Sequence, residues 1–232
     1  MPLSEAPEVF YHDVFNMIVL TFINLSNIVY LSFATDFNLI GTPFLGEKYR
    51  NLFSIFYYSF ISYLIVDTVW ISTIPKTLSG NPLPFVFHHI IVLVLCSVPY
   101  FEPQFDWLMA LSLLVEIHPL ILTIKRYVPR EGHLYKCLDT LFYVTWVLMR
   151  IIGFPILFCY YVVEYQRFSA SKGTYLNIIL LGPIILGVVT VLNYKWSYDM
   201  VCNTSKGEDK AAESPEVVKV DVESSFVINI VE

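Results

Sequence analysis

Charged residues are scarce in this chain. Asp, Glu, Lys and Arg make up 15% of its 232 residues, whereas hydrophobic residues make up 56% and aromatic residues 16%. Soluble globular domains carry roughly 25% charged residues, so this composition argues against a soluble domain. The formal net charge is −6 and no basic patch with interleaved aromatic residues is present, so nucleic acid is not an expected partner.

The motifs of several enzyme and metal classes are also missing. The four cysteines have no CxxC spacing, so neither a disulfide framework nor a zinc site is expected. The five histidines lack the HxxxH and HxxHH spacings of di-iron membrane enzymes, and the HExxH and GxSxG motifs are absent. No apolar stretch holds an interior lysine for a retinal-type Schiff base. We expect no metal and no resident cofactor.

What the chain has instead is six long apolar runs. Each is close to the length of about 20 residues that an α-helix needs to cross a bilayer. The runs cover residues 14–34, 52–74, 85–101, 105–124, 138–163 and 175–198. The predicted fold class is therefore an all-α membrane protein with about six transmembrane helices in one bundle.

Lys and Arg are distributed unevenly among the connections between these runs. Nine lie on the side that includes the connection 125–137 and the C-terminal tail, and four lie on the opposite side. Connections rich in Lys and Arg face the cytosol, so the N and C termini are both predicted to be cytosolic. The predicted domains are a cytosolic N-terminal segment 1–13, a six-span membrane domain 14–199 and a disordered acidic cytosolic tail 200–232.

Ionisable residues at the second and third runs are the first site candidates, because such groups are costly in a membrane span. Asp67 lies inside the second run, and the pair His88 and His89 lies near the start of the third. At 1.5 Å per helical residue, all three lie roughly 6 to 12 Å from the predicted cytosolic boundary. We interpret them as acid–base groups of a catalytic site. A capped buried acid, and histidines bonded to lipid phosphates, are the alternatives.

The fourth and fifth runs add Glu116, His118 and Arg150. Glu116 and His118 are about 200° apart around a helix, so they are not expected to face the same centre. Arg150 is expected to neutralise buried charge by pairing with Glu116 or Asp67. Because all these groups fall in or near the cytosolic half, we predict one shared cavity that binds lipid and opens toward the cytosol.

The order of these residues resembles a known family. Ser62, Tyr63 and Asp67 form a Ser-Tyr-x-x-x-Asp segment, and about twenty residues later His88-His89 follows. The pattern continues with Glu116, with Lys125-Arg126-Tyr127 and with Met149-Arg150-Ile151 before Phe154-Pro155. Over residues 52–163 the chain resembles the TLC domain, which is shared by ceramide synthases, translocation-associated membrane proteins and TLC domain-containing proteins.

The resemblance implies a membrane protein of the endoplasmic reticulum that is concerned with lipids; another endomembrane or the plasma membrane is the alternative. In ceramide synthases the paired histidines serve acyl transfer from acyl-CoA to the amine of a long-chain base. One of His88 and His89 would then deprotonate the amine. Ceramide synthases carry a His-Asp-x-x-Asp-type segment in the span after the pair, whereas here only the acid Glu116 remains.

This departure favours a protein that binds a lipid or acyl chain and influences membrane lipid composition. An acyl-CoA-dependent N-acyltransferase is the second hypothesis, and a protein translocation or cargo-sorting factor is the third. The expected partners are membrane lipid and, for the enzyme, acyl-CoA or a sphingoid base. A transporter is least favoured because no inverted repeat is visible. Whether the chain is catalytic, and whether it forms a homodimer, stays open at this point.

Overall fold

The computed structural model describes residues 7–34, 49–77 and 81–213 of the chain. Within these ranges the secondary structure is helical, and no strand occurs. Six spans among the described residues are long and apolar enough to cross a membrane. The predicted all-α fold with six membrane-spanning helices is therefore confirmed.

Three of the six spans are single helices, two are interrupted, and the last begins with a short 3₁₀ turn. The single helices are α1 (Pro7–Ala34), α2 (Arg50–Thr73) and α3 (Leu83–Phe101). The fourth span consists of α4 (Asp106–Ser112), the 3₁₀ segment η4 (Leu113–Glu116) and α5 (Ile117–Arg126). The fifth consists of α6 (His133–Trp146), the π-helical segment η5 (Val147–Gly153) and α7 (Phe154–Lys172). The sixth is α8 (Leu181–Glu213), and η2 (Pro75–Thr77), η3 (Pro103–Phe105) and η6 (Ile178–Leu180) are short 3₁₀ turns.

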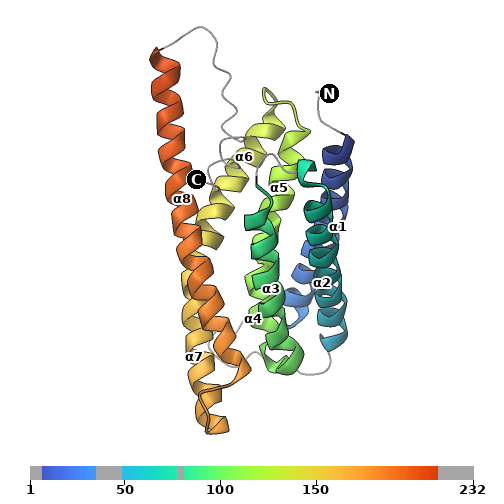
Figure 1. Ribbon diagram of the computed structural model, residues 1–232, viewed down its shortest axis with the longest axis vertical. Coiled ribbons are helices and arrows are strands. Elements are labelled where there is room, and N and C mark those ends of the chain that lie inside the picture. The colour runs from blue at the N-terminus through green and yellow to red at the C-terminus, as the bar shows by residue number, and fades with distance from the viewer. Residues whose placement is uncertain (1–6, 35–48, 78–80, 214–232) are drawn as a thin grey trace.

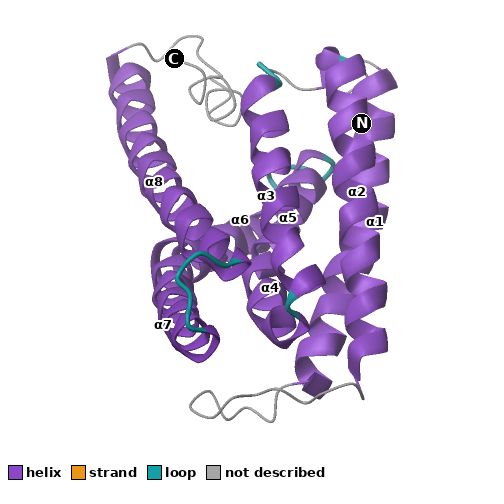
Figure 2. Cartoon of the chain, turned by 60° about the horizontal axis from the view of Figure 1, so that its bottom comes forward, coloured by secondary structure: helices purple, strands orange, loops and turns teal. Residues whose placement is uncertain are grey.

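The spans run up and down in one bundle. Figure 1 shows that α1 begins and α8 ends at the same end, which we call the upper end. The upper end also holds the end of α2 and the beginning of α3, and the lower end holds the beginnings of α2 and α4. In Figure 2, α1 and α2 lie together at one edge, α7 and α8 at the other, and α3, α4 and α5 between them.

Proline explains the two interrupted spans. Pro119 follows η4, and Pro155 follows η5. A proline has no N–H and its ring crowds the carbonyl four residues earlier, so the regular α-helical bonding must change there. Both spans nevertheless continue as one helical stretch. Pro183 lies in the first turn of α8, where no intrahelical hydrogen bond is lost.

The structure moves two expected boundaries. The first helix begins at Pro7 instead of residue 14, because proline at the first helical position and an acid in the first turn favour a helix start. At the other end α8 continues to Glu213. Residues 200–213 are thus helical where the sequence predicted disorder, and this stretch is rich in the strong helix formers Ala, Lys and Glu. Residues 1–6 and 214–232 lie outside the described residues.

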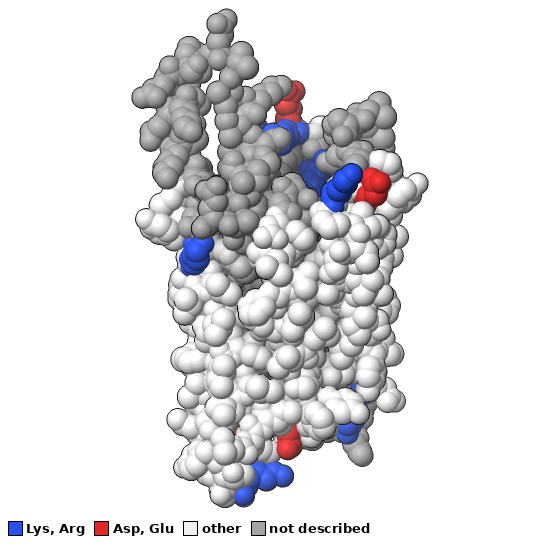
Figure 3. Space-filling model, in the orientation of Figure 1, with Lys and Arg blue, Asp and Glu red and all other residues white. Residues whose placement is uncertain are grey.

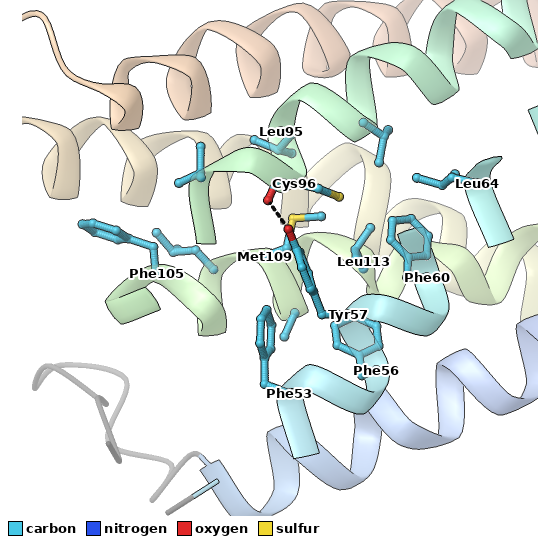
Figure 4. Packing of buried hydrophobic residues seen from close by; sticks show 14 of the residues in the cluster. Phe53, Phe56, Tyr57, Phe60, Leu64, Leu95, Cys96, Phe105, Met109 and Leu113 are labelled. Carbon is cyan, nitrogen blue, oxygen red and sulfur yellow. Dashed lines mark hydrogen bonds between the residues drawn. The ribbon is translucent and has the colours of Figure 1, made fainter. Parts of the chain in front are cut away.

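Aromatic and aliphatic side chains of α2, α3 and the fourth span form the centre of the core, as Figure 4 shows. Figure 4 labels Phe53, Phe56, Tyr57, Phe60, Leu64, Leu95, Cys96, Phe105, Met109 and Leu113. The hydroxyl of Tyr57 donates a 2.7 Å hydrogen bond to the carbonyl oxygen of Cys96. The polar end of this buried ring is therefore satisfied within the core.

The outer surface matches a bilayer. On the face shown in Figure 3, the Lys, Arg, Asp and Glu side chains of the described residues gather near the two ends and leave an uncharged band between them. Large apolar side chains such as Phe22, Val69 and Val191 are exposed on the spans. An exposed apolar surface of this extent would associate in water, whereas lipid tails cover it in a membrane.

Candidate functional site

The carboxylate of Asp67 lies between two imidazoles from different helices. Asp67, on α2, is only 5% exposed. Its Oδ1 is 2.7 Å from Nε2 of His12 on α1, and its Oδ2 is 3.6 Å from Nε2 of His89 on α3. We call these three residues, together with Thr68, the Asp67 cluster. Two separate spans thus place a histidine against the same acid.

Hydrogen-bond roles within the Asp67 cluster follow from the partners. A carboxylate only accepts, so His12 must carry a proton on Nε2. The hydroxyl of Thr68 donates to the carbonyl of Leu64 and lies 3.0 Å from Nδ1 of His89. Thr68 therefore accepts a hydrogen bond from Nδ1–H of His89. A neutral His89 then presents an unprotonated Nε2 toward Asp67, and this nitrogen can take up a proton beside the carboxylate.

The three ionisable residues of the Asp67 cluster share a depth because of where their helices begin and end. His12 comes five residues after the start of α1, Asp67 six residues before the end of α2, and His89 six residues after the start of α3. At 1.5 Å per residue, each lies about 7 to 9 Å below the upper end. Contacts of α2 with both α1 and α3 then bring the three side chains together.

Sequence reasoning missed His12, because it assigned this residue to the cytosolic segment 1–13. The ring of His12 lies 5.6 Å from that of Trp70, and Trp70 in turn stacks on Phe15 at 5.6 Å. The indole Nε1 of Trp70 is buried and has no hydrogen-bond partner in the described part of the chain. The available signal was Pro7 followed by Glu8, a typical helix start that places His12 inside the first span.

The next residue, Asp13, anchors α1 to the end of α5. Nη1 of Arg126 donates to both carboxylate oxygens of Asp13, at 2.9 and 3.1 Å, and the hydroxyl of Tyr127 donates to Oδ2 at 3.0 Å. Asp13 is 1% exposed, so these bonds compensate a buried charge. Because Asp13 is adjacent to His12, the anchor also holds His12 in place.

His118 and Arg150 belong to a second group, between α5, η5 and α8. Nε of Arg150 donates to Nδ1 of His118 at 3.3 Å, and Nη1 donates to Oδ1 of Asn193 at 2.8 Å. Nε2 of His118 lies 3.0 Å from the hydroxyl of Thr145, which itself donates to backbone carbonyls. Thr145 therefore accepts from His118, and both nitrogens of this buried ring are engaged in holding helices together.

The expected pairing of Arg150 with Glu116 is present as a longer-range electrostatic interaction and not as a direct ion pair. Among the described residues, no ion pair within 4 Å joins Arg150 to either acid. Its guanidinium instead bonds to neutral groups and lies 4.6 Å from the centre of the Trp146 ring. The π-helical segment explains the difference, since its wider turn changes the direction of side chains relative to an α-helix.

Glu116 and His88 stand outside both groups. Neither side chain has a hydrogen-bond partner among the described residues, and both keep partial exposure. The backbone carbonyl of Glu116 accepts a bond from Asn24 at 3.2 Å, which ties η4 to α1. Arg150 lies within electrostatic range of both side chains. His88 and His89 thus differ, because His89 is buried and bonded whereas His88 has a free imidazole.

Comparison with known families decides what kind of domain this is. The TLC domain family matches residues 8–202, from the first turn of α1 to α8. The chain belongs to the TLC domain family. With six apolar spans, it is a multi-pass membrane protein. Neither the search of curated proteins nor that of solved structures gave a match.

Within this TLC domain the polar groups suit proton transfer and hydrogen bonding. In the described ranges, no group of three His, Cys, Asp or Glu side chains is arranged to hold a metal ion. Asp67 accepts a hydrogen bond from His12 and lies beside His89, while Glu116 and His88 have no side-chain hydrogen-bond partner among the described residues. The six residues predicted from sequence are therefore divided between two bonded groups and two free side chains.

Proposed function

We propose that this TLC-domain protein binds a lipid or acyl chain at the upper end of its bundle and thereby influences membrane lipid composition. One observation carries the proposal. His88 and Glu116 are ionisable side chains within membrane spans, and both are partly exposed and without a hydrogen-bond partner among the described residues. A polar group without a partner at such a depth costs several kcal/mol, and a bound molecule would supply the missing partner.

The chemistry of these side chains indicates what they would bind. Glu116 offers a carboxyl group, His88 an imidazole that donates or accepts, and Arg150 a nearby positive charge. The polar part of a lipid, with its hydroxyl, amine or carbonyl groups, matches such a set, while its chain would lie among the apolar side chains. We further propose that the upper end faces the cytosol in the endoplasmic reticulum, since Lys76, Lys125 and Arg126 lie there.

The test is mass spectrometry of the lipid that co-purifies with the full-length protein. We expect the wild type to retain an acyl-chain lipid and the double variant His88→Ala/His89→Ala to lose most of it. The single variants His88→Ala and Glu116→Gln leave the Asp67 cluster intact, and they should lose it as well. His133→Ala is the matched control, because His133 is exposed at the start of α6. Equal amounts of lipid in all folded variants would contradict the proposal.

A second candidate, an acyl-CoA-dependent N-acyltransferase, is favoured by the Asp67 cluster itself. An acid that orients imidazoles is an arrangement for general acid–base chemistry. Nε2 of His89 would accept the proton of the attacking amine as the C–N bond forms and the C–S bond of the thioester breaks. The released thiolate would then take up that proton. Purified protein incubated with labelled acyl-CoA and a sphingoid base should then give an amide. If no amide forms under conditions in which a known ceramide synthase turns over, this activity is excluded.

A further inference from the structure

A polar cavity lies at the lower end of the bundle. It has a volume of about 90 Å³ and lies between the beginnings of α2 and α4 and the end of α3. A buried water needs only about 15 Å³, so the cavity admits a larger group. Arg50, on its rim, is 17 residues from Asp67 along α2, which corresponds to about 25 Å. The cavity is therefore separate from the Asp67 cluster and independent of the function proposed for it.

The acid that lines this cavity has an unused acceptor. Asp106, the first residue of α4, is 8% exposed, and its Oδ1 is buried without a hydrogen-bond partner among the described residues. Arg50 lines the same cavity, but no ion pair within 4 Å joins the two in the part that the structure describes. A buried carboxylate oxygen without a donor is costly. A ligand with an N–H group would complete this site.

Aromatic rings form the other walls. Tyr57 stacks on Phe53 with ring centres 5.3 Å apart, and the ring of Tyr58 meets that of Tyr57 edge-on at 5.2 Å. Tyr58 and Tyr100 line the cavity from α2 and α3 and are 56% and 60% exposed. The faces of such rings attract cations. A carboxylate, tyrosine rings and a guanidinium that line one cavity match a ligand that carries an ammonium and a phosphate group.

We propose that this cavity binds the phosphoethanolamine headgroup of a membrane phospholipid, with the ammonium on Asp106 and the phosphate on Arg50. The choice between amines follows from Oδ1 of Asp106, which needs a hydrogen-bond donor. A primary ammonium provides three, whereas the trimethylammonium of choline provides none. The position also fits a lipid, because the lining residues lie at helix ends, at the level of the headgroups.

The experiment uses the full-length protein, freed of lipid in detergent, and measures binding by native mass spectrometry. The probes are phosphatidylethanolamine, phosphatidylcholine with the same acyl chains, and water-soluble glycerophosphoethanolamine. We expect the first lipid to bind about tenfold more tightly than the second, because a charge-assisted hydrogen bond is gained. Asp106→Asn should remove this preference. Glu164→Gln, which changes a charge on α7 outside the cavity, should retain it.

Each outcome decides the proposal. The proposal is overturned if the wild type binds the two lipids with equal affinity. It is also overturned if Asp106→Asn leaves the preference for phosphatidylethanolamine unchanged. Tight binding of the soluble headgroup alone, equal to that of the lipid, assigns the site to a soluble amine and overturns the lipid source. If Asp106→Asn lowers the unfolding temperature without ligand, Arg50→Gln provides the second test. Arg50 is exposed, and its loss should weaken binding of phosphatidylethanolamine about tenfold through the lost phosphate contact.

Discussion

At the scale of single residues, Asp67 is an orienting group. Its Oδ1 accepts from His12 and its Oδ2 lies 3.6 Å from Nε2 of His89, so the carboxylate is enclosed between two imidazoles. His88 differs from His89 although the two are adjacent, because successive residues point about 100° apart around a helix. We therefore expect a bound molecule to meet His88, with His89 and Asp67 supporting the helix behind it.

The protonation of His89 gives a testable difference between two substitutions of Asp67. In Asp67→Asn, the amide oxygen still accepts from His12 and the amide N–H₂ donates to the unprotonated Nε2 of His89. We expect this variant to lose less than about 1 kcal/mol of unfolding free energy. Asp67→Ala leaves His12 with a buried N–H that has no acceptor and should lose about 1 to 3 kcal/mol. Chemical unfolding in detergent measures both.

The control for these variants is His133→Ala, which changes an exposed imidazole at the start of α6. Its unfolding free energy should equal that of the wild type. If Asp67→Asn proves as unstable as Asp67→Ala, then His89 is protonated beside Asp67 in the native protein and the assigned hydrogen-bond roles are wrong.

At the scale of elements, α7 and α8 pack closely at the lower end. Gly182, in the first turn of α8, lies against the ring of Tyr161 on α7, and Tyr161 is only 1% exposed. A side chain at position 182 would overlap this ring, which has no space to move. Glycine is therefore required here by the close approach of two helices.

The substitution Gly182→Ala tests this packing. The added methyl group would overlap the Tyr161 ring, so we expect a loss of about 1 to 3 kcal/mol in unfolding free energy. Gly187→Ala is the matched control one and a half turns later, because its methyl group would lie 3.3 Å from the partly exposed ring of Phe158, which needs to shift by only a few tenths of an ångström. If the two variants unfold at the same temperature, the close approach of α7 and α8 at Gly182 is incorrect.

The sequence predicted the membrane-spanning helices better than the side-chain contacts within the candidate site. The six spans follow from apolar length alone, and Asp67 and His89 meet because their positions in consecutive helices set a common depth. His12 was missed because it precedes the first apolar run, among acids, and only its partner on α2 makes it a buried residue. The hydrogen bonds of Arg150 to His118 and Asn193 were not anticipated, because the π-helical turn at Val147–Gly153 changes the direction of this side chain relative to a regular helix.

At the scale of the whole molecule, the two polar sites lie at opposite ends of the bundle. The Asp67 cluster is about 7 to 9 Å below the upper end, and the Asp106 cavity is at the lower end. An even number of spans places the beginning of α1 and the end of α8 on the same side. The excess of Lys and Arg at the upper end predicts that this side is the cytosol.

Labelling with a membrane-impermeant thiol reagent tests the orientation. In a background with Cys137, Cys159 and Cys202 changed to Ser, the variant Glu131→Cys places a thiol between α5 and α6, and Lys172→Cys places one at the end of α7. We expect the first to react in intact microsomes and the second only after the membrane is permeabilised, because the positively charged end faces the cytosol. The opposite pattern would reverse the predicted topology.

The early start of α1 has a practical consequence for anyone who expresses this protein. His12 lies only five residues from Pro7, less than two helical turns away. A purification tag or fusion partner joined directly to that helix would therefore crowd the imidazole and its contact with α2. Attachment after the end of α8 leaves this region undisturbed.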